Sequence, residues 1–460
     1  MNSRNRCQRS VKVGAGIAFA QHIAQQERAA TDLRRKSFTH HKSVLPHLDA
    51  TRTCFIRLDT LGYFPKFLII YLAAIPGQDC IKGFKIMKSI CCFVLLAASF
   101  FGNPAFADIT VGHVIPLSGV QAPIAKELNL GAKAYIDYIN ASGGVNGSKI
   151  NYIVKDDAYN PEATVRLTTE LIEKENAIAM LVGVGTPNGE ALIKSGVLKS
   201  NSVAMIGTRA GASSLYRPDN EMMFHLWASY SMEMDKIAKH YATVGLKNIA
   251  VVYQDDAYGK DVLNSLENAI SSNKLELALK APYERGSTSA DKVAKQVLAE
   301  GKVDAIVMIG VTTYAAEFLK QYRTAGGAKP IIGMSVFDPV IMVKLVGAEM
   351  IRGIGLVQVV PSPQNTVSPL MREFKKVYEK YGPKDATPST ATIQGYLSAK
   401  VFVEALKAAG PTPSRKQFYK AMESLNVDLG DYPVAFSKTR RISYVGTEIA
   451  IVLNTGKLMF

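Results

Sequence analysis

Two kinds of apolar segment alternate along the chain from residue 108 onward. Short runs rich in Val and Ile are typical of buried strands, whereas apolar residues that recur every three or four positions are typical of helices. The short runs predict strands at 109–115, 150–154, 179–184, 203–206, 249–253, 305–309 and 331–334. Strands that alternate with helices of this length form parallel sheets through right-handed crossovers, so we predict an α/β fold.

The helical segments divide this part of the chain into two halves. Helices are predicted to begin near Ile124, Pro161, Tyr258, Ser289 and Thr312, and two longer ones are predicted at 368–381 and 391–409. The strand–helix rhythm pauses near Trp227 and breaks again at the VVPSP sequence of residues 359–363. Because one doubly wound sheet seldom holds 353 residues, we predict two doubly wound lobes.

Residues 87–107 have the pattern of a secretory signal. Met87 and Lys88 provide a start and a positive charge, an apolar run covers 90–101, and Ala105-Phe106-Ala107 fits the small-x-small cleavage pattern. The run is too short to span a membrane as a helix. We expect export with cleavage after Ala107; the alternative is a buried strand or helix.

Residues 1–86 show no sustained hydrophobic period, and basic patches such as 34–36 lie beside scattered histidines. Our hypothesis is that translation begins at Met87 and that the upstream residues are an over-extended reading frame or a disordered terminus. Mass spectrometry of the native amino terminus tests this, because a mature start well before Asp108 contradicts it.

Charge and cysteine content separate the first 107 residues from the rest. These residues hold 15 of the 54 Lys and Arg but only 5 of the 39 Asp and Glu, so the remaining 353 residues carry 39 basic and 34 acidic side chains. A balance of +5 gives little support for nucleic-acid binding, and we expect none. All five cysteines precede residue 93, which suits export of the rest to an oxidising compartment.

Small polar residues follow six of the predicted strands, where parallel α/β sheets bind their ligands. They are Ser118, Thr186 with Asn188, Thr208 with Arg209, Asp255 and Asp256 after Gln254, Thr312 with Thr313, and Ser335. Any one of them can instead cap the helix that follows. Three sets in each half suit a polar small molecule held between two lobes.

Two segments come close to enzyme motifs. GVGTPNG (183–189) follows a strand and opens a helix, as a dinucleotide-binding turn does. However, Pro187 interrupts it, and no acidic residue for a ribose lies between Glu190 and Asp219. GMSVF (333–337) departs from the G-x-S-x-G nucleophile elbow at Phe337, and no histidine follows Ser335. We therefore expect no catalytic residues.

The histidines of the body give no sign of a metal centre. His113, His225 and His240 have no partner at metal-ligand spacing, and single histidines of this kind are most often structural. We expect no metal site and no cofactor.

Residues 108–460 resemble the branched-chain amino-acid type of periplasmic solute-binding protein, the receptor component of ABC importers. The resemblance rests on a P-x-S-G turn at 116–119, an N-x-x-G-G-x-x-G helix end at 140–147, the acidic pair 156–157 followed by Pro161, and VVYQDDAYG at 251–259. The glycines of the second motif let the helix end in a left-handed cap before the next strand.

The resemblance implies a type I periplasmic binding protein: two doubly wound parallel-sheet lobes joined by a three-strand hinge. The lobes would comprise 108–229 plus 361–432, and 230–360 plus 433–460. The chain would cross the hinge near 227–230, 359–361 and 432–434. Closure on a small-molecule ligand, an amino acid or a related small carboxylate, would create the form that docks on the permease subunits, in a monomeric periplasmic protein without catalysis.

Family contacts carry over to several positions of this sequence. Ser118 and the stretch to Ile124 correspond to the turn after the first strand, and Thr186, beside Asn188, corresponds to the hydroxyl that meets a ligand carboxylate. Backbone amides map near Ala210 and Gly211, and an aromatic residue of the second lobe maps to Tyr258.

Two departures from the family leave the ligand open. The acidic residue that pairs with an ammonium is replaced by Ser335, Val336 and Phe337. Either Asp255, Asp256 or Asp338 takes over, or the ligand is an aromatic or aliphatic carboxylic acid without an amino group. Trp227 stands where many relatives carry arginine, and either hinge packing or ligand stacking explains it.

Two other functions stay open at this point. One is a ligand-sensing or regulatory clamp of the same fold that signals through a protein partner. The other is a cytosolic α/β enzyme that uses residues 183–189, which detectable nucleotide binding would support.

Overall fold

The computed structural model describes residues 107–460, and the predictions for residues 1–106 lie outside this part. Its first sheet is built around β1 (Ile109–Ile115), whose side chains are all buried. β1 pairs in parallel with β2 (Ile150–Asp156) and β3 (Ala179–Leu181), and β4 (Ala204–Ile206) and β5 (Met223–Phe224) continue the sheet in the order β2-β1-β3-β4-β5.

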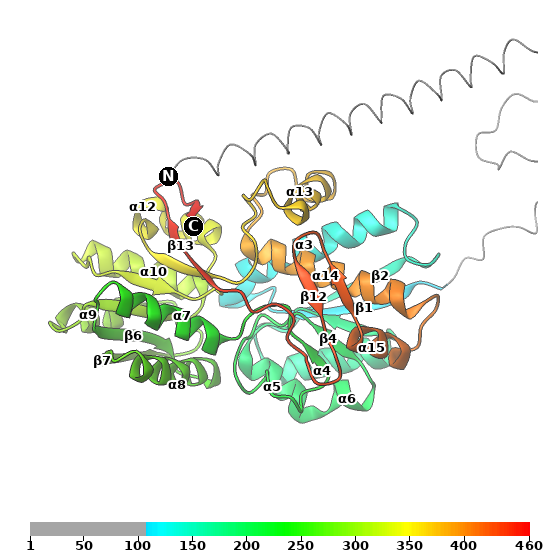
Figure 1. The fold of residues 1–460 in the computed structure, drawn as a ribbon, viewed down its shortest axis with the longest axis horizontal. Coiled ribbons are helices and arrows are strands. Elements are labelled where there is room, and N and C mark those ends of the chain that lie inside the picture. The colour runs from blue at the N-terminus through cyan, green and yellow to red at the C-terminus, as the bar shows by residue number, and fades with distance from the viewer. Residues whose placement is uncertain (1–106) are drawn as a thin grey trace, which may run out of the picture. The chain divides into compact units, whose positions relative to one another are not determined.

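The helices of the first lobe include segments from distant parts of the sequence (Figure 1). They are α3 (Ala122–Ala141) after the short η1 (Gly119–Gln121), α4 (Pro161–Glu173), α5 (Thr186–Ser195), α6 (Val197–Ser200), α13 (Pro369–Tyr381), α14 (Thr390–Ala409) and α15 (Arg415–Glu423). α3 and α14 pack at backbone distance. A Cβ added at Gly131 would lie 1.8 Å from the Thr392 carbonyl oxygen, and one at Gly395 would lie 1.9 Å from that of Leu128.

The second sheet has the order β14-β13-β10-β9-β8-β6-β7. Its parallel strands are β6 (Asn248–Gln254), β7 (Glu276–Tyr283), β8 (Ala305–Ile309), β9 (Ile331–Gly333) and β10 (Gly355–Gln358). β13 (Glu448–Val452) pairs antiparallel with β10 and also with β14 (Leu458–Met459). Its helices are α7 (Tyr230–Thr243), α8 (Ala257–Ser272), α9 (Asp291–Ala299), α10 (Thr312–Thr324), α11 (Pro339–Val346) and α12 (Ala348–Ile351).

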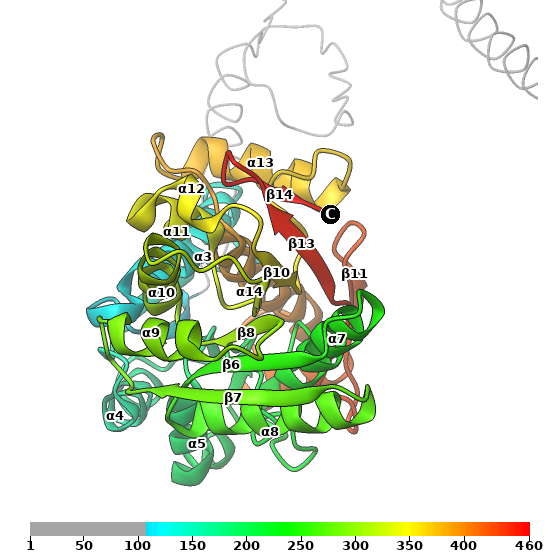
Figure 2. The same ribbon diagram turned by 90° about the vertical axis from the view of Figure 1, so that its left-hand side faces the viewer.

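Both faces of the second sheet are covered by helices (Figure 2). Along β6, Ile249 and Val251 belong to one apolar cluster, which includes residues of α7 and α8. The alternating residues Ala250 and Val252 belong to another, which includes residues of α9 and α10. Successive strand side chains point to opposite faces, so both faces of this sheet are buried, as parallel sheets require.

The α/β fold with two parallel-sheet lobes is confirmed, and each predicted strand has a counterpart. The strand predicted at 179–184 ends earlier, at Leu181, because Val182 has a positive φ of 31° that no strand continues through. β7 was missed because its alternating residues and Pro282 give a weak signal, as edge strands often do. Among residues 107–460, no helix is long and apolar enough to cross a membrane.

The chain reaches the second sheet for the last time later than the predicted crossing at 432–434. At β12 (Pro433–Ala435) it pairs with β11 (Asn426–Asp428) in a separate two-stranded sheet. Hydrogen bonds between His225 and the residues Arg441 and Ser443 still tie it to the segment that follows β5. It joins the second sheet only at β13, so the third crossing falls within 443–448. The residue boundaries of the two lobes stay a prediction.

Candidate ligand-binding cleft

A small cavity lies where the carboxyl ends of the two sheets face each other. From the first lobe it is lined by Gln121, Tyr159, Val184, Gly185 and Arg209, and from the second by Tyr258, Gly310, Val311 and Val336. Most of these residues lie within four positions after the end of a strand, including β3, β4, β8 and β9, because the backbone leaves each parallel strand at this edge. This is the edge at which parallel α/β sheets bind ligands.

Arg209 is the one charged residue in this lining. Its side chain is held from both lobes: the guanidinium donates to the Gln394 amide oxygen of α14 and, at 2.8 Å, to the Val336 carbonyl of the second lobe. Burial lowers the pKa of Arg209, and the charges of Asp338 and Glu233 oppose this shift. An arginine nevertheless stays protonated in a protein. Its guanidinium has five N–H donors, and the hydrogen bonds to Gln394 and Val336 use two of them.

Two buried carboxylates near Arg209 already have donors within the protein. Glu233 of α7 accepts hydrogen bonds from the backbone N–H and the hydroxyl of Ser335. Asp338 accepts from the backbone N–H groups of Val340 and Ile341 at the start of α11, and also from Thr390 and Ala391 of α14. Neither carboxylate belongs to the cavity lining.

Burial changes the protonation of Glu233. It raises the pKa of Glu233 from 4.5 to about 7, although the bonds from Ser335 and the charge of Arg209 favour the ionised form. The sequence gives no signal for this residue, because it lies in the first turn of α7 rather than at a strand end.

Tyrosines form the apolar part of the cleft. Tyr159 and Tyr258 line the cavity from opposite lobes, and the ring of Tyr230 lies 5.2 Å from that of Tyr258. The Tyr258 hydroxyl donates to the Gly310 carbonyl, which fixes its ring at the cavity wall. Of these residues only Tyr258 was expected from sequence.

The predicted site residues fall into three groups. Arg209 and Tyr258 line the cavity. Beside lining residues in sequence lie Thr186, Thr208, Ala210, Thr312 and Ser335, with Asn188 and Gly211 one or two residues further along. The buried hydroxyl of Thr186 has no hydrogen-bond partner among residues 107–460, whereas Thr312 donates to the Val336 carbonyl. Their roles in binding stay predictions.

The third group is not brought to this lining. Ser118 is exposed within the P-x-S-G turn, and Asp255 forms a surface ion pair with Lys260. Ile124 and Phe337 are buried in the apolar cores. Trp227 is also buried, and its indole N–H donates to the Thr208 carbonyl at 2.9 Å. These side chains have structural partners that hold them away from the cavity.

The histidines have structural surroundings. His113 contacts the Tyr152 hydroxyl, His225 contacts the Thr208 hydroxyl, and burial lowers the pKa of each histidine to about 3. Among residues 107–460, no group of three His, Cys, Asp or Glu side chains is arranged to hold a metal ion.

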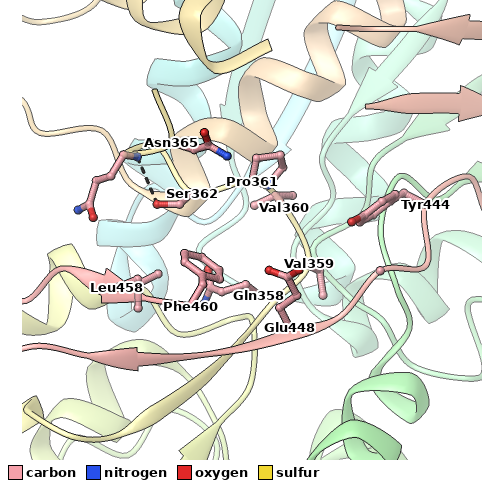
Figure 3. Close-up of a pocket in the computed structure, with 12 residues that line it drawn as sticks. Gln358, Val359, Val360, Pro361, Ser362, Asn365, Tyr444, Glu448, Leu458 and Phe460 are labelled. Carbon is pink, nitrogen blue, oxygen red and sulfur yellow. Dashed lines mark hydrogen bonds between the residues drawn. The ribbon is translucent and has the colours of Figure 1, made fainter. Parts of the chain in front are cut away.

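A larger pocket lies between the end of β10 and the carboxyl-terminal segment (Figure 3). It is lined by the end of β10 and the segment after it, by Tyr444 to Glu448 before β13, and by the carboxyl-terminal residues. Glu448 is the one charged side chain in its lining, and none of the predicted site residues lines it. We place the candidate site at the smaller cavity, because its lining includes a buried cation, Arg209, that contacts both lobes.

Known proteins resemble the chain over most of residues 107–460. Residues 108–443 match the family described as periplasmic binding protein. The Leu/Ile/Val-binding protein homolog 7 of Brucella suis is 28% identical over 320 residues, covering 66% of this chain and 78% of that protein. A match to homolog 3 of Brucella melitensis, also 28% identical, spans only half of that protein's length.

Two solved structures share the fold. The substrate-binding periplasmic protein of Ralstonia solanacearum is 35% identical, with a TM-score of 0.74 over 76% of this chain and 99% of that one. A solute-binding protein of an ABC transporter from R. palustris, in complex with benzoate, is 21% identical, with a TM-score of 0.67 over 76% and 95% of the two chains. The chain thus belongs to the periplasmic binding protein family, and within it to the branched-chain amino-acid type.

Proposed function

We propose that the protein is the periplasmic receptor of an ABC importer and that it captures a small carboxylic acid without an amino group. The ligand would lie between the lobes, and the closed form would deliver it, as a monomer, to the membrane permease. Binding and release suffice for this function, so no residue is assigned a catalytic role.

The observation that carries the proposal is the charge of the cavity lining. Arg209 is a buried cation in the lining, and the lining contains no Asp or Glu. A guanidinium offers donors that match a carboxylate in a bidentate arrangement. An ammonium enclosed beside it would lack a partner, which costs several kcal/mol.

The surroundings of Arg209 support the same ligand class. The carboxylates of Glu233 and Asp338 accept hydrogen bonds from protein donors, and neither lies in the cavity lining, which argues against either of them replacing the missing acid. Tyr159 and Tyr258 provide aromatic surface for the apolar part of a ligand. In the R. palustris relative the same fold holds benzoate.

A thermal-shift screen of the full chain tests the proposal. The probes are benzoate, 4-hydroxybenzoate, phenylacetate and hexanoate, with leucine, isoleucine and valine as the competing class. A ligand present at a hundredfold its Kd adds about 2.7 kcal/mol to the free energy of unfolding. We expect a carboxylate to give this response while the amino acids give none. Stabilisation by valine or leucine, with every simple carboxylate silent, would overturn the assigned ligand class.

A further inference from the structure

Arg285 lies in the turn after β7, in the second lobe, and is anchored there by Asp256. Its Nη1 donates to Asp256 Oδ2 at 2.7 Å, and both side chains are largely buried. Asp256 is itself fixed, because it caps α8 through the backbone N–H of Gly259 and accepts from the Gln254 amide. The guanidinium therefore projects from a rigid point of the second lobe.

The other side of the same guanidinium binds the first lobe. Nη2 donates to the Tyr159 carbonyl at 2.7 Å and to Asn188 Oδ1 at 3.2 Å. The guanidinium carbon also lies 3.5 Å from the centroid of the Tyr159 ring, which is a cation–π contact. One side chain thus joins the two lobes through two hydrogen bonds and a stacked ring.

The acceptors in the first lobe are held in place for this contact. Asn188 donates to the Thr164 hydroxyl at 2.7 Å, which directs its amide oxygen toward Arg285. Tyr159 has a left-handed backbone conformation, with φ of 63°, and its N–H is held by Asp157. Such a conformation is unfavourable for a tyrosine and persists only where its surroundings enforce it.

Arg285 also connects lobe closure to the wall of the cavity. The Tyr159 ring that it covers is part of the lining, whereas Arg285 itself is not. Contacts between the lobes form only in the closed state. Their whole free energy therefore stabilises the closed state relative to the open state. This holds with or without a ligand, because every partner of Arg285 is a protein group.

We propose that Arg285 is a positioning residue that latches the two lobes together and fixes the Tyr159 ring as one wall of the ligand cavity. The proposal rests on the proposed function for its effect on ligand binding, but the latch itself does not depend on which ligand binds. It would act chiefly on the dissociation rate, because the latch must open before the ligand leaves.

The test compares Arg285→Gln and Arg285→Lys with the wild type in the full chain. Lysine keeps the charge but lacks the planar fork that reaches three acceptors at once. Arg352→Gln is the matched control, because Arg352 forms an exposed ion pair with Glu349 in the same lobe. Stopped-flow measurements of benzoate dissociation would use the fluorescence of Trp227 as the probe, because it is the one tryptophan of the chain and is bonded to Thr208 beside the cavity-lining Arg209.

We expect benzoate to dissociate at least tenfold faster from Arg285→Gln and about fivefold faster from Arg285→Lys, with Arg352→Gln within twofold of the wild type. A rate for Arg285→Gln within twofold of the wild type overturns the latch.

Hydrogen exchange of the ligand-free proteins separates this proposal from the proposed function. The latch predicts at least threefold faster exchange in segments 156–160 and 185–189 of Arg285→Gln, with no change in Arg352→Gln. If none of the four carboxylates binds the wild type, the assigned ligand class fails while the exchange result still decides on Arg285. Equal exchange in all three proteins overturns the latch.

Discussion

The carboxylate of Glu233 accepts two hydrogen bonds from Ser335, one from the backbone N–H at 2.8 Å and one from the hydroxyl at 2.7 Å. Ser335 stands where the resemblance leads one to expect an acidic residue facing the ligand. The acid near this position comes instead from α7, and its oxygens face Ser335. The structure thus brings a carboxylate to this region without placing it in the cavity lining.

The raised pKa of Glu233 predicts a stability that falls as the pH rises. Because the native state holds the proton up to about pH 7 and the unfolded state loses it near 4.5, the native state binds more protons between these values. The contribution of Glu233 to the free energy of unfolding is therefore fully present below pH 4.5 and is lost by about pH 7. Its size is on the order of 3 kcal/mol.

Glu233→Gln removes this titration and keeps two hydrogen bonds to Ser335, since the amide oxygen accepts from the backbone N–H and the amide nitrogen donates to the hydroxyl. Urea unfolding of the full chain at pH 5, 6, 7 and 8 measures the effect. We expect a smaller loss of stability with pH than in the wild type. Glu175→Gln, at an exposed glutamate, is the control. Parallel pH profiles for wild type and Glu233→Gln would falsify the assignment.

Arg209 was predictable from sequence as a strand-end residue, but its partners were not. Its position after a short apolar run places it at the edge of a parallel sheet. Gln394, which binds it, is 185 residues away in a helix whose pattern shows only an apolar face. The same limit applies to Tyr159 and Arg285, since sequence periodicity describes one element at a time and carries no information on which loops of two lobes meet.

The carboxylate proposal predicts that binding depends on the charge and shape of Arg209. Arg209→Lys retains the charge but loses the bidentate geometry, so we expect about a tenfold higher Kd for benzoate, equivalent to about 1.4 kcal/mol. Arg209→Met should raise the Kd more than a hundredfold. Isothermal titration calorimetry measures both, with Arg217→Lys at an exposed ion pair as the control. Unchanged affinity in Arg209→Met would place the carboxylate elsewhere.

The parallel-sheet lobes were predictable because buried strands have a strong local signal. The antiparallel end of the second sheet was not, since β13 and β14 add to it from the far end of the chain. The pairing of the segment at the predicted crossing, 432–434, was not predictable for a related reason. The segment Pro433–Ala435 forms a short strand, and its sequence does not indicate whether the strand pairs with β11 or with a strand of the second lobe.

Gly131 is predicted to be irreplaceable at the crossing of α3 and α14. A methyl group there would lie 1.8 Å from the Thr392 carbonyl oxygen, which is backbone and has no other rotamer to adopt. The helices must separate, so we expect Gly131→Ala to lower the free energy of unfolding by about 3 kcal/mol despite the better helix propensity of alanine. Chemical denaturation measures this. Gly301→Ala, where a methyl group meets nothing within 4 Å, should be neutral.

The indole of Trp227 could serve either packing at the hinge or stacking against the ligand, and substitution of Trp227 distinguishes these two roles. Because the ring is buried and its N–H donates to the Thr208 carbonyl, the structure favours packing over ligand stacking. Trp227→Phe leaves that carbonyl without its donor and opens a small void, so we expect a loss of about 1 to 2 kcal/mol in the free energy of unfolding. The Kd for benzoate, measured by calorimetry because the fluorophore is gone, should change less than threefold. A tenfold weaker Kd with unchanged stability would assign the indole to the ligand instead.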